Sequence, residues 1–174
     1  MTRAEILPTD HADFVGIEKL KETHSHQLNN FRNWATAGNW RMFHGSHYDW
    51  WAFPISAPSS YGFAYSISEE TLAKLKRDQD FLSDLAEGAH LLLLSWGWDY
   101  KTNSPISGAS EDQAWAHWPI RLYKCWKSMR LFGCEIEEQA CLEYASWIHG
   151  LGESFEYQGS DLFVGMSESR SKDL

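Results

Sequence analysis

The spacing of apolar residues in the second half of the chain is the feature that most constrains the fold. Apolar side chains recur every three or four positions in 80–97, and again in 119–133 and 135–150. This is the period of an amphipathic α-helix that buries one face. A weaker stripe runs through 18–34, and no segment alternates convincingly like a strand, although 61–67 suits a short extended piece. We therefore predict an all-α fold, a single compact domain of about five to seven helices with an aromatic-rich core.

Residues typical of helix ends flank several of these segments. Ser66 and Ser68 precede Glu69 and are candidate N-caps of a short helix. Pro119 suits a first helical turn, and Gly133 suits the position just after a last turn. The helix that precedes Gly133 and the helix that follows it are therefore expected to be joined by a tight connection.

Composition and charge exclude several classes of protein. No apolar run approaches the roughly 20 residues of a membrane-spanning helix, and the N-terminus lacks the apolar segment of a signal peptide. The 3 cysteines include no Cys-x-x-Cys pair, which argues against a disulfide framework or a structural zinc site. The net charge of −9 argues against binding to nucleic acid. We expect a soluble cytoplasmic protein with reduced thiols and no cofactor, and the sequence does not indicate its oligomeric state.

Aromatic residues are abundant, at 15% of the chain, and nine of them lie between Trp40 and Tyr65. Asp49 is the single side chain in 42–68 that is charged at neutral pH. One interpretation is a ligand-binding groove, because such sites combine apolar walls with a few polar groups. The other is a buried corner whose Trp and Tyr tips find backbone partners. The candidate ligand-binding residues are His44, His47, Asp49, Trp50, Trp51 and Phe53.

An enzyme or metal protein is an alternative that uses the polar residues of the same segment. His44, His47 and Asp49 offer two imidazoles and a carboxylate, the ligands of many transition-metal sites. Gly45 and Ser46 interrupt the helix that would place the two imidazoles on one face, so we predict no metal site. No Gly-x-Ser-x-Gly motif is present, and we predict no catalytic residue.

Cationic side chains recur at every third position of 119–133 in this otherwise acidic chain. One interpretation is the solvated face of an amphipathic helix, whose long stems cover apolar surface. The other is a site for an anion or an acidic protein partner. The residues that would form this site are Arg121, Lys124, Lys127 and Arg130.

Several segments, taken in order, resemble the conserved region of the opioid growth factor receptor family. The central segment, HYDWWAFPI at 47–55, is similar to the family's His-x-Tyr-x-x-Trp-hydrophobic-Phe-Pro block. Asn33 and Trp34 precede it, at the end of a helix. The segments that follow it are LAKLK at 72–76, WPIRL at 118–122 and KSMRLFG at 127–133.

The resemblance implies an all-helical domain over 28–150, preceded by an N-terminal segment and helix start at 1–27 and followed by a partly flexible C-terminal extension at 151–174. The family's animal members are receptors for an opioid pentapeptide that restrains growth. Our leading hypothesis is a non-enzymatic domain of this kind that binds a peptide or a small aromatic ligand in a groove lined by His47, Trp50, Trp51 and Phe53.

Overall fold

The computed structural model describes residues 6–172, and it describes side chains up to residue 168. This part of the chain is mostly helical, with eight α-helices and two small hairpins, against the five to seven helices predicted. The helices are α1 (Ile17–Ala37), α2 (Trp40–Gly45), α3 (Asp49–Ala52), α4 (Glu69–Leu75), α5 (Gln79–Ser95), α6 (Pro119–Phe132), α7 (Glu135–Gly150) and α8 (Leu162–Lys172).

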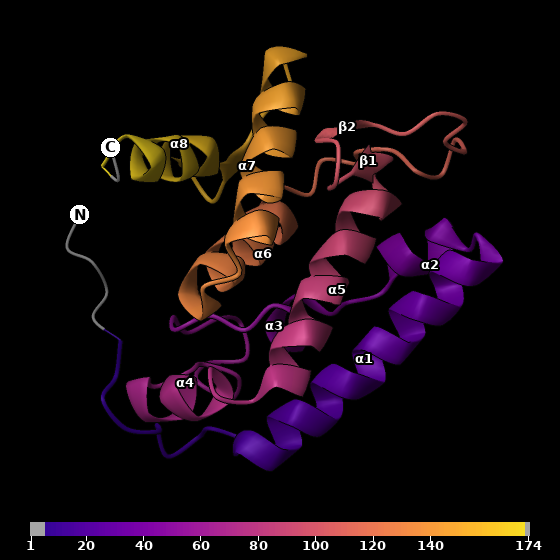
Figure 1. Ribbon diagram of the computed structural model, residues 1–174. Coiled ribbons are helices and arrows are strands. Elements are labelled where there is room, and N and C mark those ends of the chain that lie inside the picture. The colour runs from indigo at the N-terminus through magenta and orange to yellow at the C-terminus, as the bar shows by residue number, and fades with distance from the viewer. Residues whose placement is uncertain (1–5, 173–174) are drawn as a thin grey trace.

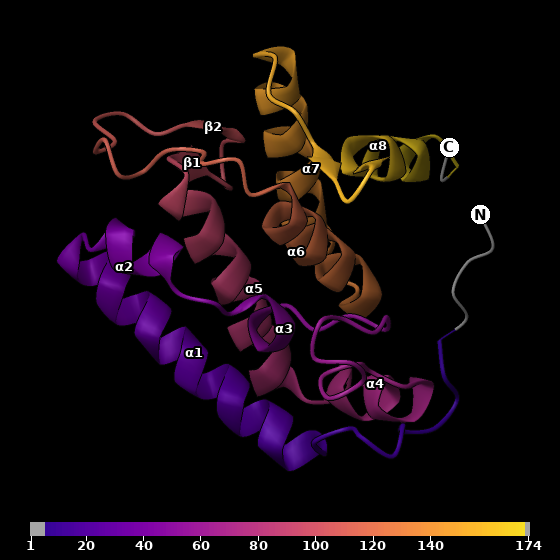
Figure 2. The ribbon, with the colours of Figure 1, turned by 180° about the vertical axis from the view of Figure 1, so that it is seen from behind.

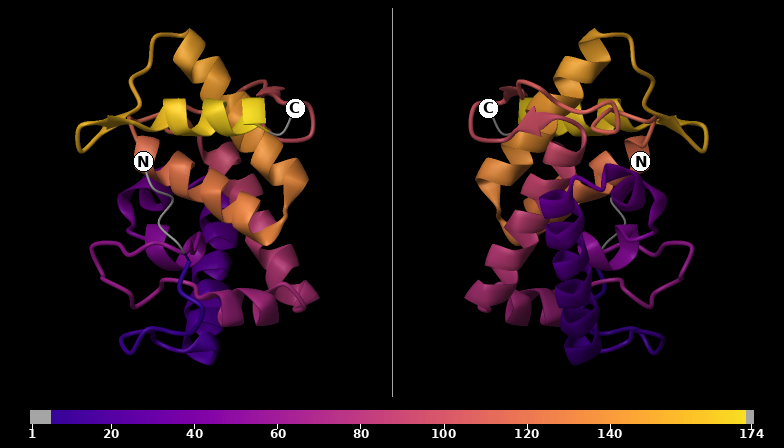
Figure 3. Two further views of the ribbon diagram at one scale, coloured as in Figure 1. Left: turned by 90° about the vertical axis from the view of Figure 1, so that its left-hand side faces the viewer. Right: turned by 90° about the vertical axis from the view of Figure 1, so that its right-hand side faces the viewer.

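Helix α5 lies at the centre and contacts α1 on one side and α6 and α7 on the other (Figure 1). Seen from behind, the short α3 lies between α1 and α6, and it contacts both (Figure 2). Figure 3 shows α4 and α8 at opposite ends of the molecule. This arrangement brings the segment between α2 and α4 against α6, although about 70 residues of chain separate them.

The predicted end signals are confirmed with one correction. Ser68 caps α4, because its Oγ accepts a hydrogen bond from the Thr71 amide at 3.2 Å. Ser66, the other candidate, is buried and does not cap the helix. Pro119 is in the first turn of α6, and Gly133 follows its last turn with a left-handed φ of 75°, a conformation that costs glycine little.

The core forms where the apolar faces of α1, α5, α6 and α7 meet, and the prediction that it is rich in aromatic residues is confirmed. Leu85 and Leu92 of α5 have no exposed surface, and neither does Met129 of α6. Phe31 and Tyr144 bring rings into the same core from α1 and α7. Burial of such side chains from water is the main favourable free-energy change in folding.

Two regions differ from the sequence-based expectation of loops and a polar tail. The hairpin of β1 (Trp98–Asp99) and β2 (Ser104–Pro105) lies within a predicted loop, and a second hairpin joins β3 (Glu156–Tyr157) to β4 (Ser160–Asp161). Helix α8 continues into the polar tail, where no helix is predicted, and buries Met166. Residues 173 and 174 of that tail lie outside the described residues.

The segment 61–67 is also not extended, because residues 61 and 63–65 form turns. In residues 6–172, no helix has the length and apolar character needed to cross a membrane.

Candidate functional site

Arg121, which the cationic pattern placed on a surface, is buried, with 2% of its surface exposed. Its Nη1 donates to the main-chain oxygen of His44 at 2.9 Å, and its Nη2 donates to that of Ser46 at 2.8 Å. Its Nε lies 3.3 Å from Asp49 Oδ1, an ion pair that lacks the alignment of a hydrogen bond. The guanidinium therefore ties the connection between α2 and α3 to the first turn of α6.

Two aromatic rings complete the environment of Arg121. Its guanidinium carbon lies 4.0 Å from the centre of the Trp118 ring and 4.6 Å from that of Tyr48. Tyr48 also accepts a hydrogen bond from Nη1 at 3.3 Å. A planar guanidinium can stack on rings and donate in its plane at the same time, which an ammonium cannot. Neither the solvated face nor the partner-binding site predicted for Arg121 is correct, because its donors are used inside the protein.

The three polar candidates of the aromatic segment do not converge on one point. His44 Nε2 lies 2.9 Å from the main-chain oxygen of Ser95, and burial lowers the pKa of His44. His47 is exposed. Burial also raises the pKa of Asp49, although the positive charges of Arg121 and Lys124 oppose this shift. In the described part of the chain, no group of three or more His, Cys, Asp or Glu side chains could hold a metal ion.

Two of the predicted aromatic residues form a cluster with two tyrosines of the loop that follows α3. Trp50 contacts Tyr61 edge to face, with ring centres 4.6 Å apart, and Trp51 contacts Tyr65 at 5.3 Å. Tyr61 is 51% exposed and the other three are half-buried. We call Trp50, Trp51, Tyr61 and Tyr65 the surface aromatic cluster.

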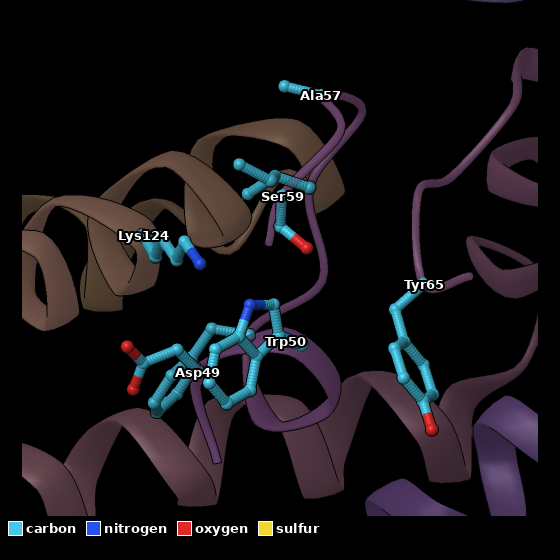
Figure 4. Close-up of a pocket in the computed structure, with 8 residues that line it drawn as sticks. Asp49, Trp50, Ala57, Ser59, Tyr65 and Lys124 are labelled. Atoms are coloured by element: carbon cyan, nitrogen blue, oxygen red, sulfur yellow. The ribbon is translucent and has the colours of Figure 1, made fainter. Parts of the chain in front are cut away.

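Phe53 has a different position from the other predicted groove residues. It is 1% exposed and belongs to the core. Its side chain is also one of those that line a shallow pocket, which we call the recess and which Figure 4 shows. The recess is lined by Asp49, Trp50, Phe53, Ile55, Ala57, Ser59, Tyr65 and Lys124.

The recess is small. Its empty volume is about 220 Å³, and this figure includes space open to solvent. The enclosed part holds roughly one water molecule. Pockets that engulf a drug-sized ligand have volumes of roughly 300–1,000 Å³. A ligand of that size would therefore lie over the recess and place one small group inside it.

The remaining cations of α6 diverge from one another. Lys124 is half-buried, and its Nζ lies 5.3 Å from the centre of the Trp50 ring. Burial lowers the pKa of Lys124, and the negative charge of Asp49 opposes this shift. Lys127 lies over Tyr123, and Arg130 pairs with Glu138 at 3.3 Å. The four cations do not form one basic patch, and Lys124 alone reaches the recess.

Sequence reasoning missed the contribution of the loop between α3 and α4. Ser59 and Tyr65 line the recess, and Tyr61 packs on Trp50. The available signal is the two tyrosines of the segment YGFAY at 61–65, because binding residues are often on loops and Tyr is enriched at interfaces.

Comparison with known proteins found no matching family model, no similar curated protein and no similar solved structure. The resemblance to the opioid growth factor receptor family therefore stays a prediction. The function has to be argued from the residues of the site itself.

Proposed function

We propose that this protein is a non-enzymatic binding domain that takes a peptide on the surface aromatic cluster. The main support is the position of Trp50, Trp51, Tyr61 and Tyr65, which remain half-buried or exposed beside a recess that has charged groups in its wall. Tyr and Trp are enriched in binding surfaces because they offer large contact areas and polar tips at little cost in side-chain entropy.

The cluster is held in place before any ligand arrives. Trp51 Nε1 donates to Gln27 Oε1 of α1 at 3.0 Å. Ser128 Oγ of α6 donates to the main-chain oxygen of Pro54 at 2.8 Å, and the Ile67 amide donates to the oxygen of Ile55 at 3.0 Å. Both ends of the loop that carries the tyrosines are thus fixed, which lowers the entropy lost on binding.

A peptide fits this surface better than a small molecule does. The recess holds only a water-sized group, whereas the rings beside it form a continuous surface: the centres of Tyr61 and Tyr65 are 6.1 Å apart. An extended segment can cover such rings with successive side chains. The family resemblance makes an opioid pentapeptide the first probe to try.

Binding is favoured over catalysis because the candidate acid–base groups have separate tasks. The His44 ring contacts the Ser95 carbonyl of α5, whereas Asp49 pairs with Arg121. General acid–base chemistry needs such groups within hydrogen-bond reach of one substrate atom. We therefore propose for Asp49 a structural role at the edge of the recess.

The test is a screen of the protein, as the whole chain, against an array of random 12-residue peptides and the opioid pentapeptide. Peptides that bind should lose at least about tenfold in affinity with Trp50→Ala, because hot-spot aromatic residues contribute at this level. The matched control is Trp147→Ala, which removes a 41% exposed Trp of α7 that does not line the recess. The proposal fails if no peptide binds, or if both variants bind like the original chain.

A further inference from the structure

Three hydrogen-bond donors of the recess are turned toward the same space. Figure 4 shows the Lys124 ammonium, the Ser59 hydroxyl and the Trp50 indole nitrogen around it. Ser59 Oγ already accepts a hydrogen bond from the Tyr61 amide at 3.1 Å, which leaves its proton available to an outside acceptor. Among the side chains that the structure describes, up to residue 168, neither Lys124 Nζ nor Trp50 Nε1 has a hydrogen-bond or ion-pair partner.

The carboxylate at the edge of the recess does not neutralise these donors. Asp49 is paired with the buried Arg121 and, in Figure 4, its carboxylate lies away from the Ser59 hydroxyl. Arg121 and Lys124 are both cations, so with Asp49 they leave an excess of positive charge at this end of the recess.

Lys124 therefore has no ion-pair partner of its own in the described residues, because the nearby Asp49 is paired with Arg121. Its ammonium is half-buried, and this loss of water lowers its pKa. A charge that has lost part of its hydration is stabilised by an anion with hydrogen-bonding geometry. The contact with the Trp50 ring compensates for only part of that loss.

We propose that the recess binds a carboxylate of the peptide, with Lys124 Nζ, Trp50 Nε1 and Ser59 Oγ as its donors. This inference rests on the proposed function and adds the chemical class of the ligand. The water-sized room suits a carboxylate oxygen and excludes an aromatic ring. The apolar side chain next to the carboxylate then lies on the surface aromatic cluster. The carboxylate is either the free C-terminus of the peptide or the side chain of an Asp or Glu.

The test uses the peptides that bind in the array and measures their affinity in matched forms. One form carries a C-terminal amide, and another has each Asp and Glu replaced by Asn and Gln. Removal of the carboxylate that occupies the recess should lower affinity about ten- to hundredfold, the range of a hydrogen-bonded charge. The form that causes the loss identifies the source of the carboxylate.

The protein side of the test is Lys124→Met, which keeps the apolar stem and removes the charge. This variant should lower the affinity for the carboxylate form of the peptide by the same factor. It should also abolish the difference in affinity between the carboxylate and neutral forms. Lys127→Met is the matched control, because Lys127 is on the same helix but lies over Tyr123. Ser59→Ala should give a smaller loss, and binding should weaken as salt rises.

The failure of this inference is distinguishable from the failure of the proposed function. The carboxylate site is wrong, and the binding surface is retained, if Trp50→Ala lowers the affinity for peptides but neither the neutral peptide forms nor Lys124→Met changes it. If no peptide binds, both are wrong. If Lys124→Met fails to fold, the neutral forms of the peptide still decide the question with the original chain.

Discussion

Two aromatic regions of this protein have similar composition and opposite surroundings. The surface aromatic cluster borders the recess, whereas Trp96, Trp98, Trp115 and Tyr144, which we call the tryptophan core, pack between α5, α7 and the loop before α6. Trp96 stacks on Tyr144 with ring centres 5.6 Å apart, and both are buried. A high aromatic content therefore does not mark a site. A site also needs exposed rings and polar groups that a ligand can reach.

The polar tips of the two regions show the same contrast. In the described part of the chain, the indole nitrogens of Trp96, Trp98 and Trp115 and the Tyr144 hydroxyl are buried without a hydrogen-bond partner. Each such group carries a desolvation cost of about 1–3 kcal/mol. The Trp50 nitrogen borders the open recess instead. Packing thus holds the tryptophan core together although its polar tips lack partners. In the surface aromatic cluster, the Trp50 nitrogen stays available to a ligand.

The largest expected effect is on stability in the tryptophan core. Trp96→Ala should lower the free energy of unfolding by about 3–5 kcal/mol, because it leaves a cavity in a buried region. Tyr61→Ala in the surface aromatic cluster should cost under about 1 kcal/mol, because half of its surface is already exposed. Urea denaturation measures both values. Equal losses would show that the two regions are parts of one core.

The next largest effect compares the stability contributions of two cations of α6, the buried Arg121 and the more exposed Lys127. Arg121→Met should lower the free energy of unfolding by about 3 kcal/mol, because it leaves Asp49 half-buried without its counter-ion. Lys127→Met, on the same helix, should change stability by less than about 0.5 kcal/mol. A loss below about 1 kcal/mol for Arg121→Met would contradict the role of Arg121 as the tie between α2, α3 and α6.

Acid should destabilise the side of the molecule that carries the surface aromatic cluster. His24 of α1 is buried and packs on Phe81, and burial lowers its pKa to about 4, although the main chain of Ala52 opposes this shift. The unfolded chain takes up a proton near pH 6.5, which the folded chain does not do until near pH 4. The contribution of His24 to stability is thus complete above pH 6.5 and is lost as the pH falls toward 4.

The expected loss between pH 7 and pH 5 is about 2 kcal/mol from His24. Urea denaturation at the two pH values measures it. His24→Asn should remove most of this dependence, and His26→Asn, which changes an exposed neighbour on the same helix, should leave it unchanged. A pH dependence that persists in His24→Asn would assign it to other groups.

The smallest effects concern two single hydroxyls, one in the tryptophan core and one beside Arg121. Tyr144→Phe removes a buried hydroxyl that has no partner, so stability should stay within about 0.5 kcal/mol or rise. Tyr48→Phe removes a hydroxyl that accepts from Arg121, and it should cost about 1 kcal/mol. Thermal or urea unfolding of the two variants gives the comparison. A clear loss with Tyr144→Phe would mean that its hydroxyl has a bound partner.

The long helices could be predicted from the sequence because their apolar residues recur every three or four positions. The ends of α6 and α7 lie within a residue or two of the predicted ones, since Pro119 and Gly133 have strong local preferences. Arg121 was misplaced because its spacing identifies a face of the helix and not what covers that face. Its partners, His44 and Asp49, are more than 70 residues away in the sequence.

The site was predicted only in part for the same physical reason. Trp50, Trp51 and Asp49 were identified from their unusual segment, and Lys124 was identified from an independent pattern on another helix. Nothing local indicates that Lys124 and Trp50 face each other, because that contact depends on how α3 packs against α6. Tyr61 and Tyr65 lie in a loop that has no periodicity, so their pairing with the two tryptophans was out of reach.

The most direct measurement of the contrast between the two regions uses the indole N–H signals of the 10 Trp residues in an NMR titration with a peptide that binds in the array. Single Trp→Phe variants assign the signals. We expect the signals of Trp50 and Trp51 to shift with increasing peptide and those of Trp96, Trp98 and Trp115 to stay in place. Shifts confined to the tryptophan core, with the Trp50 signal unchanged, would instead place the binding site in the tryptophan core.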